Sequence, residues 1–177
     1  MLGVAAVVLA ADQATKAAVL ASGPGARAAG ELLRVELVRN RGAAFGLGPA
    51  LTPLYAAAAV LAVAVCLYYG LRSRPAVLSA TLGLIAGGAA GNLADRLARP
   101  PGPFHGAVID WIKVAFYPPA FNLADVALRA GVAILVVRML YQAYHVGPRV
   151  PPGSVPSAPH LTSPRAAPEE DLSSAAG

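Results

Sequence analysis

LTPLYAAAAVLAVAVCLYYGL, residues 51–71, is an almost uninterrupted apolar run with a proline near its start. It has the length of roughly 20 residues that an α-helix needs to cross a bilayer. The rest of the chain agrees, because 56% of its 177 residues are hydrophobic, only 13% are charged, and its mean hydropathy is +0.59. A soluble domain carries about 25% charged residues. The composition therefore predicts an integral membrane protein.

Further apolar segments predict three more spans. The expected spans are residues 1–21, 51–71, 76–97 and 122–145, with extracytoplasmic excursions at 22–50 and 98–121. A small β element is expected at residues 33–37, where apolar and charged residues alternate with period two. The second excursion, rich in Pro and aromatic residues, is expected to be non-helical and to lie on the membrane surface. We therefore expect residues 1–146 to form one all-α membrane domain of four transmembrane helices, with a disordered, Pro/Ser/Ala-rich cytoplasmic tail at 147–177.

The first apolar segment has an alternative interpretation. A signal peptide is also a short apolar run followed by small residues, such as Ala10 and Ala11 here. However, the segment lacks a positively charged start, and its apolar pattern resumes at Ala17. These two observations favour a first transmembrane helix.

Four spans place both termini on one side of the membrane. Arg72 and Arg74 lie between the second and third spans, and Arg138 and Arg149 flank the end of the fourth. Because cytoplasmic connections are enriched in Lys and Arg, this side is expected to be cytoplasmic. The opposite side also carries basic residues, which makes the charge signal uneven: Arg27, Arg34, Arg39, Arg41, Arg99 and Lys113.

Composition argues against several function classes. The net charge is +5, but the basic residues are mostly isolated arginines at the ends of apolar runs, so nucleic acid is not an expected partner. The single cysteine, Cys66, allows no internal disulfide, and the three histidines are too scattered to predict a metal or other cofactor. No serine or threonine has a plausible histidine partner, which argues against a serine-type triad.

Two carboxylates stand at the edges of apolar sequence, in VIDW at 108–111 and in FNLAD at 121–125. An acid near the bilayer is costly, so two of them predict a functional site. Asn122 is placed to cap the fourth span, and Asp125 in its first turn is also explained by the helix dipole. The dipole does not explain Asp110, nor the polar residues that end the neighbouring span on the same side: Asn92, Asp95 and Arg96.

Two carboxylates held within a few ångströms of each other share a proton, because their repulsion disfavours the doubly ionised state. The ionised carboxylate can then take a proton from water while the protonated one polarises a carbonyl. This chemistry, which is that of aspartic proteases, needs neither a metal nor a nucleophilic side chain. Asp110 and Asp125 are the candidates for it.

Two other polar features are open to more than one interpretation. Asp12 and Lys16 are four residues apart on one helix, which predicts an ion pair or a direct role in the site. Asn40 to Gly42 is a turn by its own sequence, and becomes functional only in a wider context. The third span contains glycines at spacings that allow close helix packing: Gly83, Gly87, Gly88 and Gly91.

Five motifs now occur in order: DQATK at 12–16, NRGAAF at 40–45, GGAAGNLADR at 87–96, VID at 108–110 and FNLAD at 121–125. Together they resemble lipoprotein signal peptidase, the bacterial membrane aspartyl peptidase also called signal peptidase II, over roughly residues 1–145. The resemblance implies a multi-pass protein of the bacterial cytoplasmic membrane. It also implies that the chain cleaves diacylglyceryl-modified prolipoproteins just before the lipidated cysteine.

The resemblance also assigns residues. Asp110 and Asp125 match the catalytic aspartates, and the supporting or substrate-binding positions are matched by Asn92, Asp95, Arg96, Asn122, Asn40, Gly42, Asp12 and Lys16. It implies that the protein has no metal or cofactor. Its expected partners are prolipoproteins and membrane lipids, and it is expected to be a monomer.

Three features depart from the family pattern. The stretch 99–104 lengthens the connection between Asp95 and Asp110 and is expected to alter the loop over the site. Gly46 stands where a small hydroxyl residue is common. Arg129, one helical turn after Asp125, can either pair with that carboxylate or extend to lipid phosphate, and the second is favoured because a rigid ion pair would hinder acid–base work.

Two functions of other classes compete with a peptidase. A small transporter or proton channel would use membrane acids to relay ions, and it predicts polar residues along several spans, whereas here they gather at one end. A scaffold that binds acyl chains without turnover would need the same position in the membrane. Incubation with a diacylglyceryl prolipoprotein separates the three.

Overall fold

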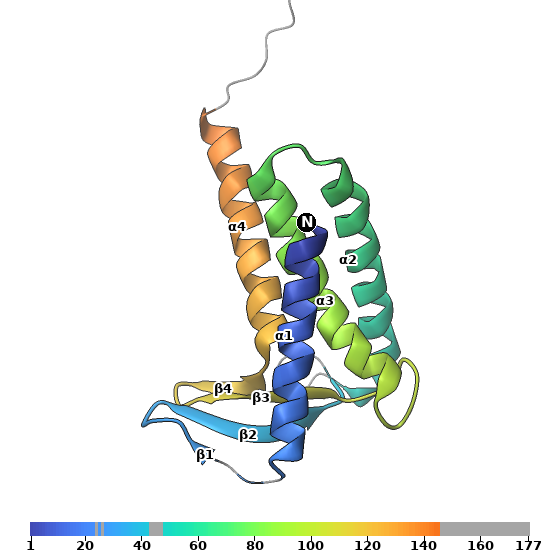
Figure 1. Ribbon diagram of the computed structural model, residues 1–177, viewed down its shortest axis with the longest axis vertical. Coiled ribbons are helices and arrows are strands. Elements are labelled where there is room, and N and C mark those ends of the chain that lie inside the picture. The colour runs from blue at the N-terminus through green and yellow to red at the C-terminus, as the bar shows by residue number, and fades with distance from the viewer. Residues whose placement is uncertain (24, 26, 43–47, 146–177) are drawn as a thin grey trace, which may run out of the picture.

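The computed structural model describes residues 1–23, 25, 27–42 and 48–145, so the predicted tail and Gly46 lie outside the described residues. Four long helices stand side by side: α1 (Leu2–Ala21), α2 (Thr52–Arg72), α3 (Ala76–Ala98) and α4 (Leu123–His145). A sheet lies across one end of the helices, and the N-terminus lies toward the other end (Figure 1). A short 3-10 turn at Pro49–Leu51 leads into α2.

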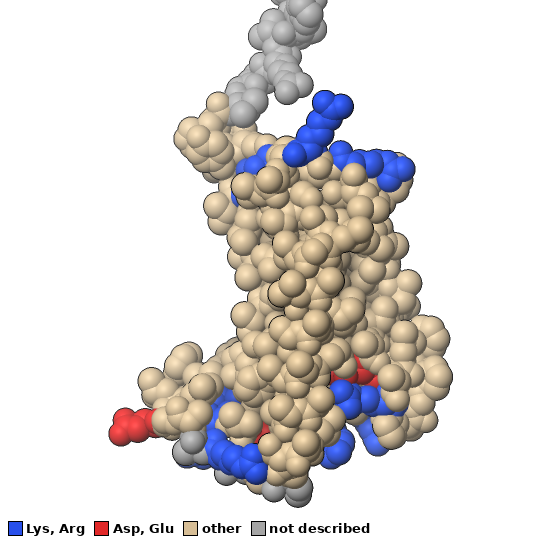
Figure 2. Space-filling model, in the orientation of Figure 1, with Lys and Arg blue, Asp and Glu red and all other residues tan. Residues whose placement is uncertain are grey.

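A helix occupies each of the four segments expected to span the membrane, with bounds that differ by at most one residue at each end. Among the described residues, α1, α2 and α3 are each long and apolar enough to cross a membrane, and α4, the predicted fourth span, is not in that group. Lys and Arg side chains gather at both ends of the molecule, and the face in view between them is uncharged (Figure 2). The chain is thus a largely helical membrane protein.

α3 is the central helix, because it packs against each of the other three. Its glycines allow this. A Cβ at Gly87 would lie 2.7 Å from the carbonyl oxygen of Ala5 on α1. A Cβ at Gly88 would collide with the carbonyl oxygen of Ala124 and lie 2.9 Å from the backbone nitrogen of Leu128, both on α4. Backbone therefore meets backbone on both sides of α3, as the spacing of its glycines predicts.

The sheet has four antiparallel strands in the order β1 (Arg27–Ala28), β2 (Leu33–Asn40), β3 (Val108–Val114) and β4 (Tyr117–Phe121). The predicted strand at 33–37 is confirmed and runs on to Asn40. β3 and β4 were not expected, because the second excursion is dominated by Pro and aromatic residues. β3 forms by pairing with β2 from the other excursion, with Asn40 opposite Val108 and Val38 opposite Asp110.

Asp110 belongs to the excursion expected at the membrane surface, and that location stays a prediction. Its side chain is buried, with the residue only 2% exposed. The reason is that β3 is covered by α1 and α3, which both contact it. The small β element is therefore a layer that closes one end of the helices, with Asp110 on the covered side.

Substitution of Gly88 by alanine should destabilise the protein. The added methyl group meets α4 backbone, which cannot yield as a flexible side chain does, so the free energy of unfolding should fall by about 1–3 kcal/mol. Thermal unfolding in detergent measures this. Gly3→Ala is the matched control, because nothing lies within 4 Å of its Cβ position, and its Tm should stay unchanged or rise slightly. Equal Tm values for the two variants would contradict the packing described for α3.

Candidate active site

The predicted acids meet where the helix ends contact the sheet. Asp110 lies on β3 and Asp125 in the first turn of α4, and both line a cavity of about 70 Å³. Asn40, Asn92, Arg96 and Arg129 line the same cavity. Since a water molecule takes about 30 Å³ in the liquid, this space accommodates at least one water next to polar partners.

Asp110 accepts hydrogen bonds from two side-chain amides. Nδ2 of Asn40 lies 2.9 Å from Oδ2, and Nδ2 of Asn122 lies 2.6 Å from Oδ1. Burial raises the pKa of Asp110 from its ordinary 3.8 to about 6, and the charge of Asp125 adds to this rise. The two amides and the charge of Lys16 act in the opposite direction. Asp110 therefore holds a proton at a pH where an exposed aspartate is ionised.

Asp125 is held by Asn122 and Asn92. The backbone nitrogen of Asp125 donates to Oδ1 of Asn122 at 2.9 Å, and the backbone nitrogen of Asn122 donates to Oδ2 of Asp125 at 3.3 Å. This reciprocal pair is a capping box and confirms Asn122 as the cap of α4. Nδ2 of Asn92 donates to Oδ1 of Asp125 at 2.8 Å. Since Asn122 also donates to Asp110, one side chain contacts both halves of the acid pair.

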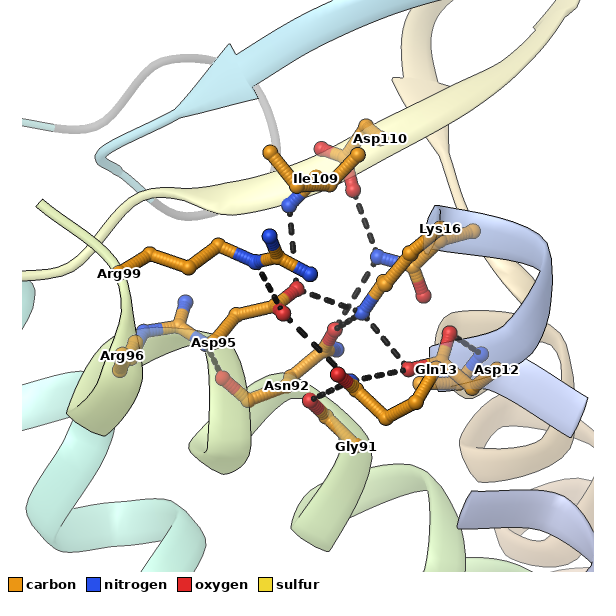
Figure 3. A network of polar contacts seen from close by, with 12 residues as sticks. Asp12, Gln13, Lys16, Gly91, Asn92, Asp95, Arg96, Arg99, Ile109 and Asp110 are labelled. Atoms are coloured by element: carbon orange, nitrogen blue, oxygen red, sulfur yellow. Dashed lines mark hydrogen bonds and ion pairs between the residues drawn. The ribbon is translucent and has the colours of Figure 1, made fainter. Parts of the chain in front are cut away.

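The predicted ion pair between Asp12 and Lys16 is confirmed, and it is part of a larger buried group. Nζ of Lys16 lies 2.7 Å from Oδ2 of Asp12 and 2.8 Å from Oδ2 of Asp95, and all three side chains are fully buried. Nζ also donates to Oδ1 of Asn92 at 3.3 Å (Figure 3). Asp95 thus faces Lys16, while Asp110 and Asp125 face the cavity.

Arg96 connects the site to the loop after β2. Its Nη1 donates to the carbonyl oxygen of Asn92 at 3.2 Å, and its Nη2 lies 3.5 Å from the carbonyl oxygen of Gly42. The amide of Gly42 in turn donates to Oδ1 of Asn40 at 2.9 Å. This contact orients the Asn40 side chain so that its Nδ2 points to Asp110. The turn at Asn40 to Gly42 therefore belongs to the candidate site.

Arg129 does not pair with Asp125 among the described contacts. Its guanidinium lies 5.9 Å from the ring centre of Tyr117 and 5.8 Å from that of Phe121, at the outer limit of a cation–π contact. Its reach to lipid phosphate stays a prediction.

The stretch 99–104 was expected to alter the loop over the site, and this stays a prediction. The connection that contains it is held at the end of α3, where the amide of Gly106 donates to the carbonyl oxygen of Arg96 at 3.1 Å. The described residues that line the cavity do not include 99–107.

Two contributors were not predicted. Nε2 of Gln13 donates to the carbonyl oxygen of Gly91 at 3.0 Å and lies 3.4 Å from Oδ1 of Asp95. Nε of Arg99 lies 2.6 Å from the same oxygen of Asp95. Asp95 and Arg99 are four residues apart on one helix, a spacing from which their ion pair could have been predicted. The contacts of Gln13 depend on the packing of α1 against α3, which the sequence does not indicate. Within the described part of the chain, no three His, Cys, Asp or Glu side chains are grouped so that they could hold a metal ion.

Two solved structures of a bacterial membrane enzyme, both obtained by the in meso method, share this fold. One aligns with a TM-score of 0.69 at 24% identity and covers 78% of this chain and 86% of that chain. The other aligns with a TM-score of 0.65 at 24% identity and covers 77% of this chain and 90% of that chain.

Curated relatives are more similar in sequence. The lipoprotein signal peptidase of Streptomyces coelicolor is 46% identical over 110 residues, which are 61% of this chain and 52% of that protein. That of Rhodococcus jostii is 39% identical over 140 residues, covering 77% of this chain and 70% of that protein. That of Pelotomaculum thermopropionicum is 41% identical over 140 residues, covering 76% of this chain and 88% of that protein. The chain spans about half the length of the Streptomyces relative and of the one from Leifsonia xyli, 52% and 56% respectively.

The pattern that defines the signal peptidase (SPase) II family matches residues 4–141. This range includes the whole sheet and all four long helices, apart from the first two residues of α1 and the last four of α4. Together with the similarity to curated relatives, this match shows that the chain belongs to the signal peptidase II family.

Proposed function

We propose that this chain is an aspartic endopeptidase that removes signal peptides from diacylglyceryl-modified prolipoproteins, cutting just before the lipidated cysteine. The observation that carries the proposal is that Asp110 and Asp125 line one cavity and are joined through Asn122. Membership of the signal peptidase II family supports the substrate class.

In the proposed reaction a water molecule lies between the two carboxyl groups. Asp110, whose pKa burial raises to about 6, holds the proton and donates it in a hydrogen bond to the scissile carbonyl oxygen. Asp125, which accepts a hydrogen bond from the amide of Asn92, is the base in this proposal. It takes a proton from the water as the oxygen attacks the carbonyl carbon, and that proton passes to the departing amide nitrogen.

The proposed placement in the membrane has α1 to α4 crossing as four spans, with the sheet and the site outside the cytoplasm. Three helices of sufficient length and apolarity support it, as does the uncharged band in Figure 2. Arg72 ends α2 and Arg74 lies in the connection to α3, which is at the end of the helices remote from the sheet (Figure 1). These arginines support a cytoplasmic location of that end and of both termini. A site at the outer edge of the bilayer meets a signal peptide where it leaves the membrane. In this proposal a single copy acts in the bacterial cytoplasmic membrane, surrounded by lipid.

The direct test uses purified protein in lipid or detergent with a diacylglyceryl prolipoprotein. Mass spectrometry of the products should give a free signal peptide and a mature chain that begins with the lipidated cysteine. The same mixture with a prolipoprotein that lacks the diacylglyceryl group is the control for substrate class. Stable binding of the substrate without any cleavage would favour an acyl-binding scaffold instead.

Asp110→Asn and Asp125→Asn should each abolish cleavage, because either change removes the shared proton or its acceptor while keeping the shape of the side chain. Both variants should remain folded in thermal unfolding, and their product yield is measured against wild type. Glu36→Gln is the matched control, since that acid is partly exposed, does not line the cavity and forms an ion pair with Lys113 at 3.2 Å. Full activity in either aspartate variant would remove the pair from the mechanism.

Asn40→Ala should shift the pH dependence of kcat/KM. The Asn40 amide stabilises the ionised form of Asp110, so its loss should raise the pKa of Asp110 above about 6. A hydrogen bond to a charged group contributes about 1.5–3 kcal/mol, which corresponds to an upward shift of roughly 1–2 pH units. Because the proposal requires protonated Asp110, the alkaline limb of the profile should move upward. A limb that stays in place or moves downward contradicts the role given to Asp110.

A further inference from the structure

Two buried carboxylates outside the cavity each hold the peptide group next to one of the site's acids. Oδ1 of Asp12 accepts a hydrogen bond from the backbone nitrogen of Ala124 at 3.0 Å, and Ala124 directly precedes Asp125. Oδ2 of Asp95 accepts one from the backbone nitrogen of Ile109 at 3.1 Å, and Ile109 directly precedes Asp110. Asp12 thus holds the start of α4 from α1, and Asp95 holds β3 from α3.

The ammonium group of Lys16 joins these two carboxylates, which the side-chain amide of Gln13 also bridges, with Nε2 3.2 Å from Oδ2 of Asp12 and 3.4 Å from Oδ1 of Asp95. Nζ of Lys16 lies 2.7 Å from Asp12 and 2.8 Å from Asp95, and in Figure 3 it points between them. Its third donor goes to Oδ1 of Asn92 at 3.3 Å, so all three of its N–H groups have acceptors. Because that contact occupies the amide oxygen of Asn92, the amide nitrogen is left to donate to Asp125.

We propose that Lys16 is a positioning residue that sets the separation of Asp110 and Asp125. It does so by holding together the two carboxylates, Asp12 and Asp95, that anchor the peptide groups next to them. The inference rests on the proposed function, since it concerns the geometry of the same acid pair.

The physical reason is the balance of charge in this buried group. Without the ammonium, two fully buried carboxylates would face each other, and their repulsion is strong where water does not screen it. Arg99 pairs with Asp95 at Oδ1, and the Gln13 amide is uncharged, so neither replaces the charge of Lys16 between the two carboxylates. As Asp12 and Asp95 move apart, the backbone N–H groups bound to them move as well. The distance between Asp110 and Asp125 then changes, although neither of these two residues is substituted.

Lys16→Arg tests the geometry with the charge conserved. A guanidinium presents its donors as a wide planar fork and cannot bring both carboxylates to one nitrogen. The variant should fold, and its kcat should fall by about 100-fold, the loss that a displacement near 1 Å produces, while KM changes little. Lys113→Arg, at the only other lysine of the chain, is the matched control and should keep wild-type kcat.

A second readout separates positioning from mere support of the fold. The two limbs of the pH–rate profile belong to the acid pair, and their spacing grows with the interaction between its members. In Lys16→Arg every charged group around the pair remains, including Arg96 and Arg129. A narrower pH interval between the two limbs therefore reports a longer distance between the carboxyl groups of Asp110 and Asp125. A loss of activity that follows the folded fraction, with unchanged spacing, would overturn the inference.

The possible outcomes distinguish the inference from the function on which it rests. Wild-type protein that cleaves, together with Lys16→Arg at full kcat, overturns the inference alone. Wild-type protein that does not cleave overturns the proposed function and this inference with it. If Lys16→Arg does not fold, Asp12→Asn replaces it, because its oxygen still accepts from Ala124 while its amide nitrogen repels Lys16. The same loss of kcat and narrowing of the limbs is expected, and wild-type values would overturn the inference.

Discussion

Asn122 joins the two halves of the site through both ends of its side-chain amide. Its oxygen caps α4 by accepting from the backbone of Asp125, and its nitrogen donates to Asp110 on β3 at 2.6 Å. The same nitrogen lies 3.0 Å from Oδ1 of Asn92 on α3. A cap that ordinarily only begins a helix here also fixes that helix relative to a strand and to its neighbour. The position of each acid therefore depends on the position of the other.

This arrangement requires α3 and α4 to approach closely at the level of the site. Gly88 provides the approach, because any side chain there would meet the backbone around Ala124. Gly91, one turn nearer the sheet, lies equally close to Asp12, where an added Cβ would be 2.6 Å from the carboxylate oxygen. The glycines of α3 thus determine both how the helices pack and how the buried charges reach the ends of α4 and β3. The same glycines therefore allow both the close packing of the helices and the position of the buried Asp12 carboxylate.

The helices and part of the site followed from sequence because their signals are local. An apolar run of sufficient length predicts a span, and the spacing of Asp12 and Lys16 predicts their ion pair. The sheet was only partly predictable, since β3 pairs with a strand about 70 residues earlier, as the contact of Asn40 with Asp110 illustrates. The burial of Asp110 was missed for the same reason. The contact of Lys16 with Asp95 depends on α1 packing against α3. The hydrogen bonds to Ala124 and Ile109 use backbone N–H groups, so the types of those two residues do not predict them.

In the proposed mechanism, Asp110 and Asp125 act on one water molecule. A crystal structure at a resolution that shows ordered water tests it most directly. We expect a water in the cavity within hydrogen-bond distance of a carboxyl oxygen of each residue, which places those two oxygens about 5–6 Å apart or closer. A structure in which another side chain separates the two carboxyl groups, or in which the water reaches only one of them, would contradict the account.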